Sequence, residues 1–235
     1  MTSQLNKIED YWNQRSFGYS LDNQEELLHD QEKWIELINR YLKINKGMKV
    51  LDLGCGPGFF SVMLTNLGCQ VIGIDYSDKM LEEARNNARK FKANVEFQKM
   101  DVQDLAFQDE IFDLIITRNV TWNLEKPVQA YQEMVRVLKK QGHLLNIDGN
   151  HYYHYQDQDY NRAGHSDHQH MEGIDVSIID NIAKELKLSY VLRPQYDIEI
   201  LKEIGFQQVE SQILSKEKTN EGKELIRQFL IHAIK

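Results

Sequence analysis

The sequence predicts an α/β domain built on a doubly wound, mostly parallel sheet of seven strands. Between residues 48 and 148, short apolar runs alternate with stretches of helical pattern, which is typical of right-handed β-α-β crossovers. A glycine-rich segment follows the first apolar run, where open α/β sheets bind ligands. No helical pattern separates the last two apolar runs, so we expect them to form an antiparallel hairpin at one edge of the sheet.

Bulk composition indicates one globular domain. The chain has 235 residues, of which 41% are hydrophobic and 27% charged, and no Ser/Gly/Pro-rich linker divides it. Neither a signal-peptide pattern nor an apolar run long enough to span a bilayer is found, and Cys55 and Cys69 are too few for a disulfide framework. We therefore expect a cytoplasmic protein. A net charge of -8 argues against nucleic-acid or membrane partners.

The elements follow in order from the N-terminus. A polar, aromatic-containing segment precedes a helix that Asp22 and Glu25 are expected to start as a capping box, and this helix runs to about residue 43. The expected parallel strands are 48–54, 69–75, 93–101, 112–119 and 143–148. The helices between them are expected at 59–68, 77–91 and 126–140.

The pattern changes after residue 150. Residues 150–196 are polar and rich in histidine and tyrosine, with one amphipathic stretch at 176–188, and we expect 150–170 to be a flexible, solvated lid. A helix over 197–206 and strands over 206–214 and 224–234 close the domain.

The most informative segment is the turn after the first strand, Asp52-Leu53-Gly54-Cys55-Gly56-Pro57-Gly58. Its glycines permit unusual dihedral angles and close approach of a ligand to the backbone. The spacing is G-x-G-x-G, and Phe59 stands where a dinucleotide-binding loop has its third glycine. No Gly-Lys-Ser/Thr follows, so the segment is not a P-loop.

This loop, preceded by the acidic Asp52, resembles the first motif of class I S-adenosylmethionine-dependent methyltransferases. The resemblance covers about residues 48–150 and implies a Rossmann-like sheet and S-adenosylmethionine as cofactor. We expect the chain to form a single domain over residues 1–235. It is divided into an N-terminal lid and helix (1–45), a cofactor-binding core (46–150), a substrate-side insert (151–196) and a closing helix and strands (197–235). One departure from the family is Lys140-Gln141 in place of Pro-Gly before the fifth strand.

The resemblance also assigns residues at the other strand ends. Asp75, about 20 residues after the glycines, stands where an acid binds the ribose hydroxyls. Asp101 corresponds to the adenine-contacting acid, and Asn119 lies in the fourth-motif position beside the methionine moiety. Further cofactor contacts are expected at neighbouring positions: Cys55, Tyr76, Met80 and Val102.

Two segments are candidates for the acceptor side. In the N-terminal segment, Tyr11, Trp12, Arg15 and Tyr19 either close over the cofactor, with aromatic rings against the sulfonium, or pack against the following helix. Trp122 and Arg193 are candidate substrate contacts, although an arginine before a helix is often only solvated. His151 and His154 are the candidate general bases.

Five histidines fall close together in the insert: His151, His154, His165, His168 and His170. A His-x-x-His-x-His pattern is compatible with a transition metal, but no cysteine lies nearby, so we expect no metal.

The sequence thus predicts methyl transfer by in-line displacement to the O, N or S atom of a small molecule that it does not identify. The alternatives are an RNA or protein methyltransferase, a catalytically silent cofactor-binding regulator, and a nicotinamide oxidoreductase, which Phe59 disfavours. Oligomeric state cannot be inferred.

Overall fold

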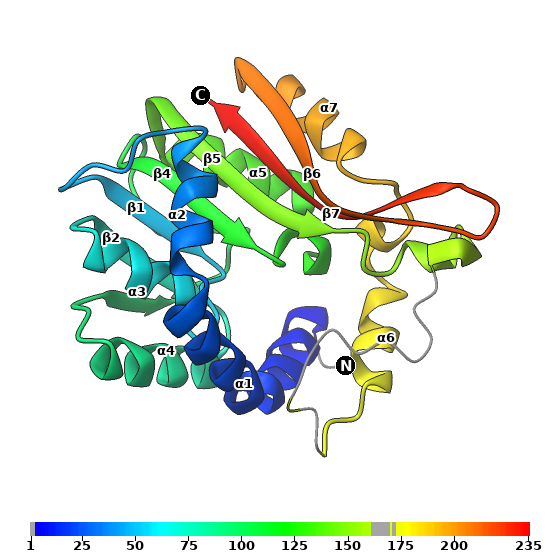
Figure 1. Cartoon of the computed structure of the whole chain (residues 1–235), viewed down its shortest axis with the longest axis horizontal. Coiled ribbons are helices and arrows are strands. Elements are labelled where there is room, and N and C mark those ends of the chain that lie inside the picture. Colours follow the sequence, from blue (N-terminus) through cyan, green and yellow to red (C-terminus); the bar gives the residue numbers. More distant parts are fainter. Residues whose placement is uncertain (1–2, 161–169, 171–172) are drawn as a thin grey trace.

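The computed structural model describes residues 3–160, 170 and 173–235, and it confirms the predicted α/β class (Figure 1). Seven strands form one sheet in the order β3-β2-β1-β4-β5-β7-β6. Strands β1 to β5 are parallel, whereas β7 is antiparallel to both of its neighbours and forms the expected edge hairpin with β6. The strands are β1 (Lys49–Leu53), β2 (Gln70–Asp75), β3 (Glu96–Lys99), β4 (Phe112–Arg118), β5 (Leu138–Gly149), β6 (Gln208–Lys218) and β7 (Glu224–Ile234).

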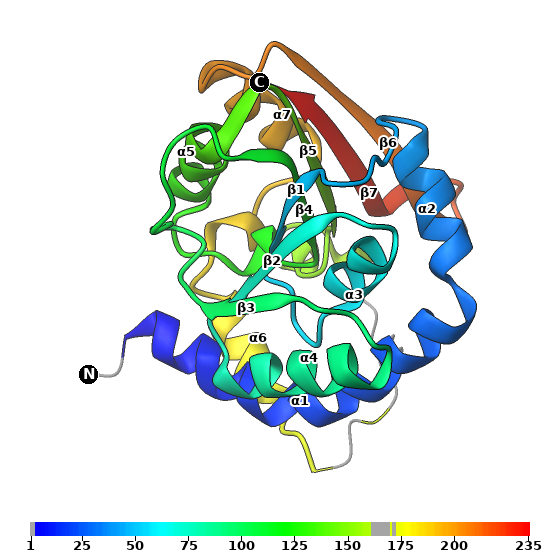
Figure 2. The ribbon, with the colours of Figure 1, turned by 90° about the vertical axis from the view of Figure 1, so that its left-hand side faces the viewer.

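Helices cover both faces of this sheet, and Figure 2 shows α2 and α5 on opposite sides of it. The α-helices are α1 (Gln4–His29), α2 (Gln31–Asn39), α3 (Phe59–Asn66), α4 (Asp78–Lys90), α5 (Pro127–Val137), α6 (Ser177–Ala183) and α7 (Gln195–Glu203). Four short 3-10 helices are also present among the described residues: η1 (Thr121–Asn123), η2 (Tyr153–Tyr155), η3 (Gln158–Tyr160) and η4 (Lys187–Ser189).

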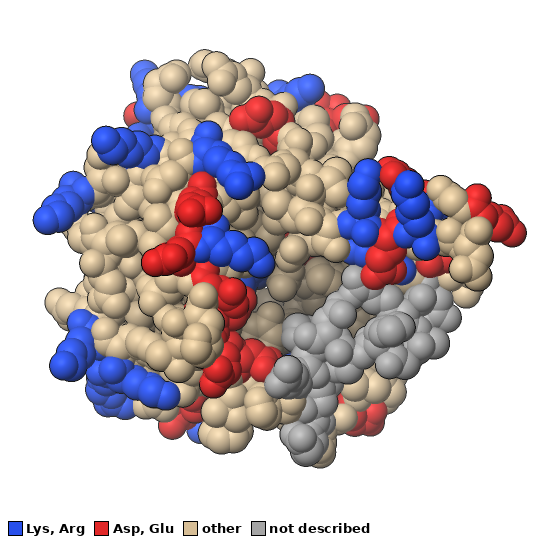
Figure 3. Space-filling view, viewed as in Figure 1, with Lys and Arg blue, Asp and Glu red and all other residues tan. Residues whose placement is uncertain are grey.

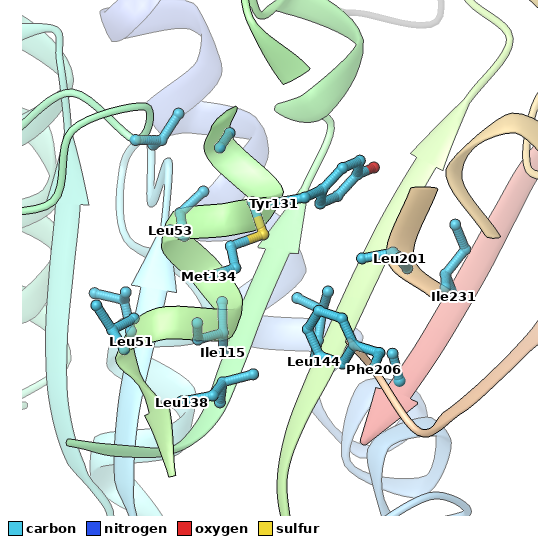
Figure 4. Close-up of a cluster of buried hydrophobic side chains, with 14 of the residues drawn as sticks. Leu51, Leu53, Ile115, Tyr131, Met134, Leu138, Leu144, Leu201, Phe206 and Ile231 are labelled. Carbon is cyan, nitrogen blue, oxygen red and sulfur yellow. The ribbon is translucent and has the colours of Figure 1, made fainter. Parts of the chain in front are cut away.

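Alternating side chains of the strands build two hydrophobic cores, one on each face. Leu51 and Leu53 of β1 pack with α5 and α7 in the core shown in Figure 4. Val50 points to the other face and packs with α2 and α3. This period of two on a strand with no exposed face explains why β1 is a continuous apolar run.

The N-terminal helix differs from the prediction. Helix α1 begins at Gln4, where the Ser3 side chain accepts a hydrogen bond from the backbone N–H of Asn6 at 3.2 Å, and it continues through Asp22. The capping box expected at Asp22 and Glu25 is therefore wrong. The buried face of α1 contains polar residues such as Ser20, which bonds to Asn87 of α4, so apolar periodicity could not show it.

The junction of α5 and β5 also differs. The helix ends at Val137, three residues before its predicted end at residue 140. The next residue, Leu138, already pairs with Phe112 of β4. The pairing then skips to His143, and Gln141 takes a φ of 62° in this irregular segment. The family's Pro-Gly turn is thus replaced by a bulge at the start of β5.

The insert is more ordered than predicted, within the part that the structure describes. Tyr160 is buried, its carbonyl accepts a hydrogen bond from Arg227 of β7 at 2.9 Å, and its hydroxyl accepts one from the Ile226 N–H at 3.1 Å. Helix α6 packs on α1 through Ile179 and Ile182. Residues 151–160 are thus attached to β7 through Tyr160, while the other side chains of this stretch are partly or fully exposed.

None of the helices in the described ranges is both long and apolar enough to cross a membrane.

Candidate cofactor and acceptor site

A pocket lies at the carboxyl ends of β1, β2 and β4, where the sheet order changes direction between β1 and β4. Its volume is about 740 Å³, including space open to solvent. Ten of the predicted contact residues line it: Trp12, Tyr19, Gly54, Gly56, Asp75, Tyr76, Met80, Asp101, Val102 and Asn119.

The glycine loop has the backbone conformation that the sequence predicts, but its glycines do not share one role. Gly54, Gly56 and Gly58 all have positive φ angles, of 66°, 51° and 90°. A Cβ at Gly54 would lie 2.4 Å from Cγ2 of Val120, whereas a Cβ at Gly56 would meet no atom within 4 Å. Only Gly56 therefore leaves open space for a ligand. Gly58 begins α3 and does not line the pocket.

Asp75 ends β2 and organises the loop. Its Oδ2 accepts a hydrogen bond from the Gly56 N–H, and its Oδ1 accepts one from the Ser77 N–H, both at 2.9 Å. Burial raises the pKa of Asp75 despite these two bonds. Ser77 then caps α4, as predicted, by accepting a hydrogen bond from the Met80 N–H at 3.0 Å.

Asp52 does not line the pocket. Its carboxylate lies under the loop, where it accepts hydrogen bonds from the Ser61 N–H at 2.8 Å and the Ser61 hydroxyl at 2.6 Å. Burial raises its pKa to about 6. We interpret Asp52 as the residue that attaches the first turn of α3 to β1. Cys55 is also buried outside the pocket lining.

Two amide side chains present unpartnered oxygens at this site. The Oδ1 atoms of Asn119 and Asn123 are buried without a hydrogen-bond partner, and both residues line the pocket. Because such groups cost free energy when left unpaired, they indicate a ligand that carries N–H or O–H donors. Asp101 also faces the pocket, although Gln103 already donates to its carboxylate from its backbone N–H at 2.9 Å. S-adenosylmethionine, with amino and hydroxyl donors at several positions, fits this set of acceptors.

One wall of the pocket is a stripe of α1, of which the sequence predicted only Trp12 and Tyr19 as contacts. Leu5 and Ile8 line it together with Trp12 and Tyr19, at helical spacing. This spacing indicates a helix that begins well before Asp22, where the capping pattern had placed its start. The rings of Trp12 and Tyr19 are 5.9 Å apart in an edge-on arrangement.

Tyr11 and Arg15 lie behind that stripe. Tyr11 packs in a cluster with Trp122 and α6, and not against the following helix, which was the alternative that the sequence left open. Arg15 is buried, and its guanidinium donates to the His170 carbonyl at 3.1 Å.

Arg118 is the only Lys or Arg among the described lining residues, and it is already paired. It donates two hydrogen bonds to Glu26 of α1, at 2.8 and 2.7 Å, so it attaches α1 to the end of β4. Its guanidinium also lies about 5 Å from the ring centres of Trp34, Phe59 and Phe60.

Arg193 is not available to a substrate, so its predicted role is wrong. Its guanidinium is completely buried and bonds to Asp197 at 2.7 and 2.9 Å and to Asp148 at 3.0 Å. Asp197 lies four residues along the chain, but Asp148 is brought to it only by the fold. Burial would raise the pKa of Asp148, but the charge of Arg193 holds that pKa well below its usual range.

The Asp148 carboxylate connects this buried network to the candidate base. Its Oδ2 accepts a hydrogen bond from the Trp122 N–H at 2.9 Å, and its Oδ1 lies 3.3 Å from Nε2 of His151. The His151 ring is partly exposed and 5.3 Å from the Trp122 ring, which in turn stacks on Tyr152. Trp122 and His151 are thus held together at the ends of β4 and β5.

The other histidines of the insert are not gathered in this way. His154 contacts the rings of Tyr152 and Tyr155, and burial lowers its pKa. His165 and His168 lie outside the described residues. Within the described ranges, no three His, Cys, Asp or Glu side chains are placed to hold a metal ion.

Comparisons with known proteins show the family of this chain. A family model described as a methyltransferase domain matches residues 44–215. A ubiquinone biosynthesis O-methyltransferase of Coxiella burnetii is 30% identical over 100 residues, 43% of each chain. A demethylmenaquinone methyltransferase of Listeria welshimeri is 32% identical over 120 residues, 49% of this chain and 51% of the relative. The matches thus span about half the length of these curated relatives.

Solved structures share the fold at lower identity. Phosphoethanolamine N-methyltransferase 2 of Haemonchus contortus, in complex with S-adenosyl-L-methionine, has a TM-score of 0.71 at 17% identity, over 100% of this chain and 60% of that one. A SAM-dependent methyltransferase from Aquifex aeolicus has a TM-score of 0.58 at 21% identity, over 89% and 91%. With the family match over most of the chain, the glycine loop and the acceptor-rich pocket, the protein belongs to the class I S-adenosylmethionine-dependent methyltransferases.

Proposed function

We propose that this enzyme methylates a small, uncharged acceptor that carries a flat ring. The observation that carries the proposal is the chemistry of the wall that α1 contributes, which consists of Leu5, Ile8, Trp12 and Tyr19. The charged lining residues are three acids and Arg118, which Glu26 already pairs. Among the described residues, the lining thus offers no free cation for a carboxylate or phosphate group of the acceptor.

The two curated relatives support the same class of acceptor. They are named for ubiquinone biosynthesis and for demethylmenaquinone, and quinones contain a flat, uncharged ring. Aromatic side chains bind such rings through edge-on or offset stacking.

The residues of this chain divide the work as follows. Gly56, Asp75, Asp101, Asn119 and Asn123 would hold S-adenosylmethionine, which supplies a sulfonium methyl group for in-line displacement by the acceptor. The α1 wall would exclude water and align the acceptor, which carries much of the catalysis in such a displacement.

His151 would serve as the base when the acceptor is a hydroxyl. Because its Nε2 faces Asp148 at 3.3 Å, its Nδ1 remains to accept a proton. The Asp148 carboxylate would stabilise the imidazolium that forms.

Purified enzyme with S-adenosylmethionine should be offered neutral phenols and hydroquinones, phosphate- or carboxylate-bearing amines, RNA and protein, with products identified by mass. Methylated phenols or hydroquinones support the proposal. Turnover confined to anionic acceptors or to a macromolecule would refute it. Tight cofactor binding with no turnover on any acceptor would favour the silent regulator.

The base assignment has its own test, with His154→Gln as a matched control from the same insert. His151→Gln should lower kcat by about 100-fold or more and remove the acid limb of the pH–rate profile, while S-adenosylhomocysteine affinity stays unchanged. His154→Gln should retain both. Equal activity of the two variants would exclude His151 as the base.

A further inference from the structure

A second pocket lies at the opposite end of the sheet from the cofactor site. It is formed where the α2–β1 connection meets the starts of β4 and β5, and its volume is about 640 Å³, including open space. Its lining includes Tyr41, Lys43, Asp113, Lys139, Lys140 and His143. The cofactor pocket lies instead at the carboxyl ends of the strands, so methyl transfer makes no use of this second one.

This pocket has an excess of positive charge in a protein whose net charge is -8. Lys139 is neutralised by Asp113, at 2.7 Å. Lys43 and Lys140 have no acidic partner within 4 Å among the residues that the structure describes, so two cations remain free. Figure 3 shows Lys and Arg side chains at the upper left, over the α2–β1 connection.

A chain of hydrogen bonds stands behind the pocket wall. Nδ1 of His143 lies 2.9 Å from Nε2 of His232, and Nδ1 of His232 lies 2.9 Å from the Glu210 carboxylate. The carboxylate can only accept, so the His232 Nδ1–H donates to it, and Nε2 of neutral His232 accepts from the His143 Nδ1–H. His143 therefore keeps the lone pair on its Nε2, which can take up a proton.

The charged and titratable groups around His143 come from every element packed near it. They are His232 on β7, Glu210 on β6, Tyr41 and Lys43 on the α2–β1 connection, Asp113 on β4, and Lys139 and Lys140 on β5. Burial lowers the pKa of His143, and a positive charge on His232 would lower it further. His143 is thus mostly neutral at pH 7 without a ligand. A bound anion would favour protonation of the His143–His232 pair, and the Glu210 carboxylate can stabilise the added charge.

We propose that this pocket is a binding site for a small phosphate-bearing anion. Lys43 and Lys140 supply the two charges, and His143, once protonated, donates a hydrogen bond from Nε2. A dianionic phosphate matches two lysines and an imidazolium better than a carboxylate does, and lysine is a common phosphate ligand. The two free lysines argue against a metal cation.

The site can be tested by calorimetry with inorganic pyrophosphate. The full chain should be saturated with S-adenosylhomocysteine so that the probe cannot enter the cofactor pocket. We expect binding at millimolar or lower concentration. Repeating the titration in buffers of different ionisation enthalpy should reveal proton uptake at pH 7, and affinity should fall as pH rises, because binding favours protonated His143.

Matched variants separate a built site from general charge attraction. Lys43→Ala/Lys140→Ala should weaken binding at least about tenfold, since two charge-assisted contacts are lost. Lys33→Ala/Lys202→Ala removes two exposed lysines elsewhere and should leave the affinity nearly unchanged. His143→Gln should abolish the proton uptake.

Each contrary result overturns a defined part. No binding at millimolar pyrophosphate, or equal losses in the two double variants, would refute the site. Binding without proton uptake would refute the role of His143. Unchanged S-adenosylhomocysteine affinity in every variant would show that the protein remains folded.

Discussion

Asp52 gives a quantitative prediction, because it is a buried carboxylate whose pKa the structure shifts strongly. It is 2% exposed, and its acceptor bonds from Ser61 and the charge of Arg118 offset only part of the cost of its burial. The result is a pKa raised from 3.8 to about 6. The perturbation we consider is Asp52→Asn, which keeps an oxygen acceptor for Ser61 but cannot ionise.

The sign follows from proton binding. Between the two pKa values, the folded protein holds a proton on Asp52 that the unfolded chain has lost. The free energy of unfolding of the wild type therefore falls as pH rises through this window. For pKa values of 3.8 and about 6, the fall amounts to about 2 kcal/mol between about pH 4.5 and pH 7.5.

Urea unfolding of the wild type and of Asp52→Asn across this pH range measures the effect. Their difference in free energy, wild type minus variant, should decrease by about 2 kcal/mol, whatever constant offset the substitution introduces. Asp113→Asn is the control. Partial burial raises the pKa of Asp113, but the Lys139 hydrogen bond and charge lower it overall. The difference in unfolding free energy between wild type and Asp113→Asn should therefore not change with pH above pH 4.5. A flat difference for Asp52 as well would refute the assignment of its raised pKa to burial.

Three further predictions concern the loop and the network beneath it. Asp75→Ala should weaken S-adenosylmethionine binding roughly 10- to 100-fold in calorimetry and also lower the Tm, because the Gly56 N–H loses its acceptor; Asp75→Asn should fall between wild type and alanine. Gly54→Ala should destabilise the fold by about 1–3 kcal/mol more than Gly56→Ala in urea, because both positions have a positive φ but only a Cβ at Gly54 clashes with a neighbouring side chain; Gly56→Ala should instead reduce cofactor affinity, and equal stability losses would contradict the two roles. Arg193→Met should cost about 3–5 kcal/mol of unfolding free energy because it leaves buried carboxylates unpaired, and a variant as stable as wild type would show that the network contributes nothing to folding.

The central sheet was predictable because its signals are local. A continuous apolar run such as 48–54 identifies a strand buried on both faces, and Ser77 and Pro127 mark the starts of two helices by their own chemistry. The edge hairpin followed from two strand patterns without a helix between them.

The start of α1 was harder to predict from local signals, because part of its buried face is polar. Its buried positions include Ser16, Ser20 and Asn23, and the partner of Ser20 lies on a segment far away in sequence. Asn87, for example, donates to the Ser20 hydroxyl at 3.2 Å and to the Pro57 carbonyl at 2.9 Å. This polar face has no apolar period, so the signal for a start before Asp22 lies on the pocket side of the helix, in the helical spacing of Leu5, Ile8, Trp12 and Tyr19.

In the candidate site, the sequence likewise indicates where polar residues lie, whereas only the fold shows which partners they have. Sequence position placed Asp52, Arg193 and Asn119 near strand or helix ends, but it could not tell which of them is already paired. In the structure, Ser61 donates hydrogen bonds to Asp52, and two buried acids accept those of Arg193, so both residues stabilise the fold. Asn119 keeps a buried oxygen without a partner on the pocket wall. Because an unpaired buried acceptor is costly unless a ligand satisfies it, pairing separates structural polar residues from ligand contacts at this site better than residue type does.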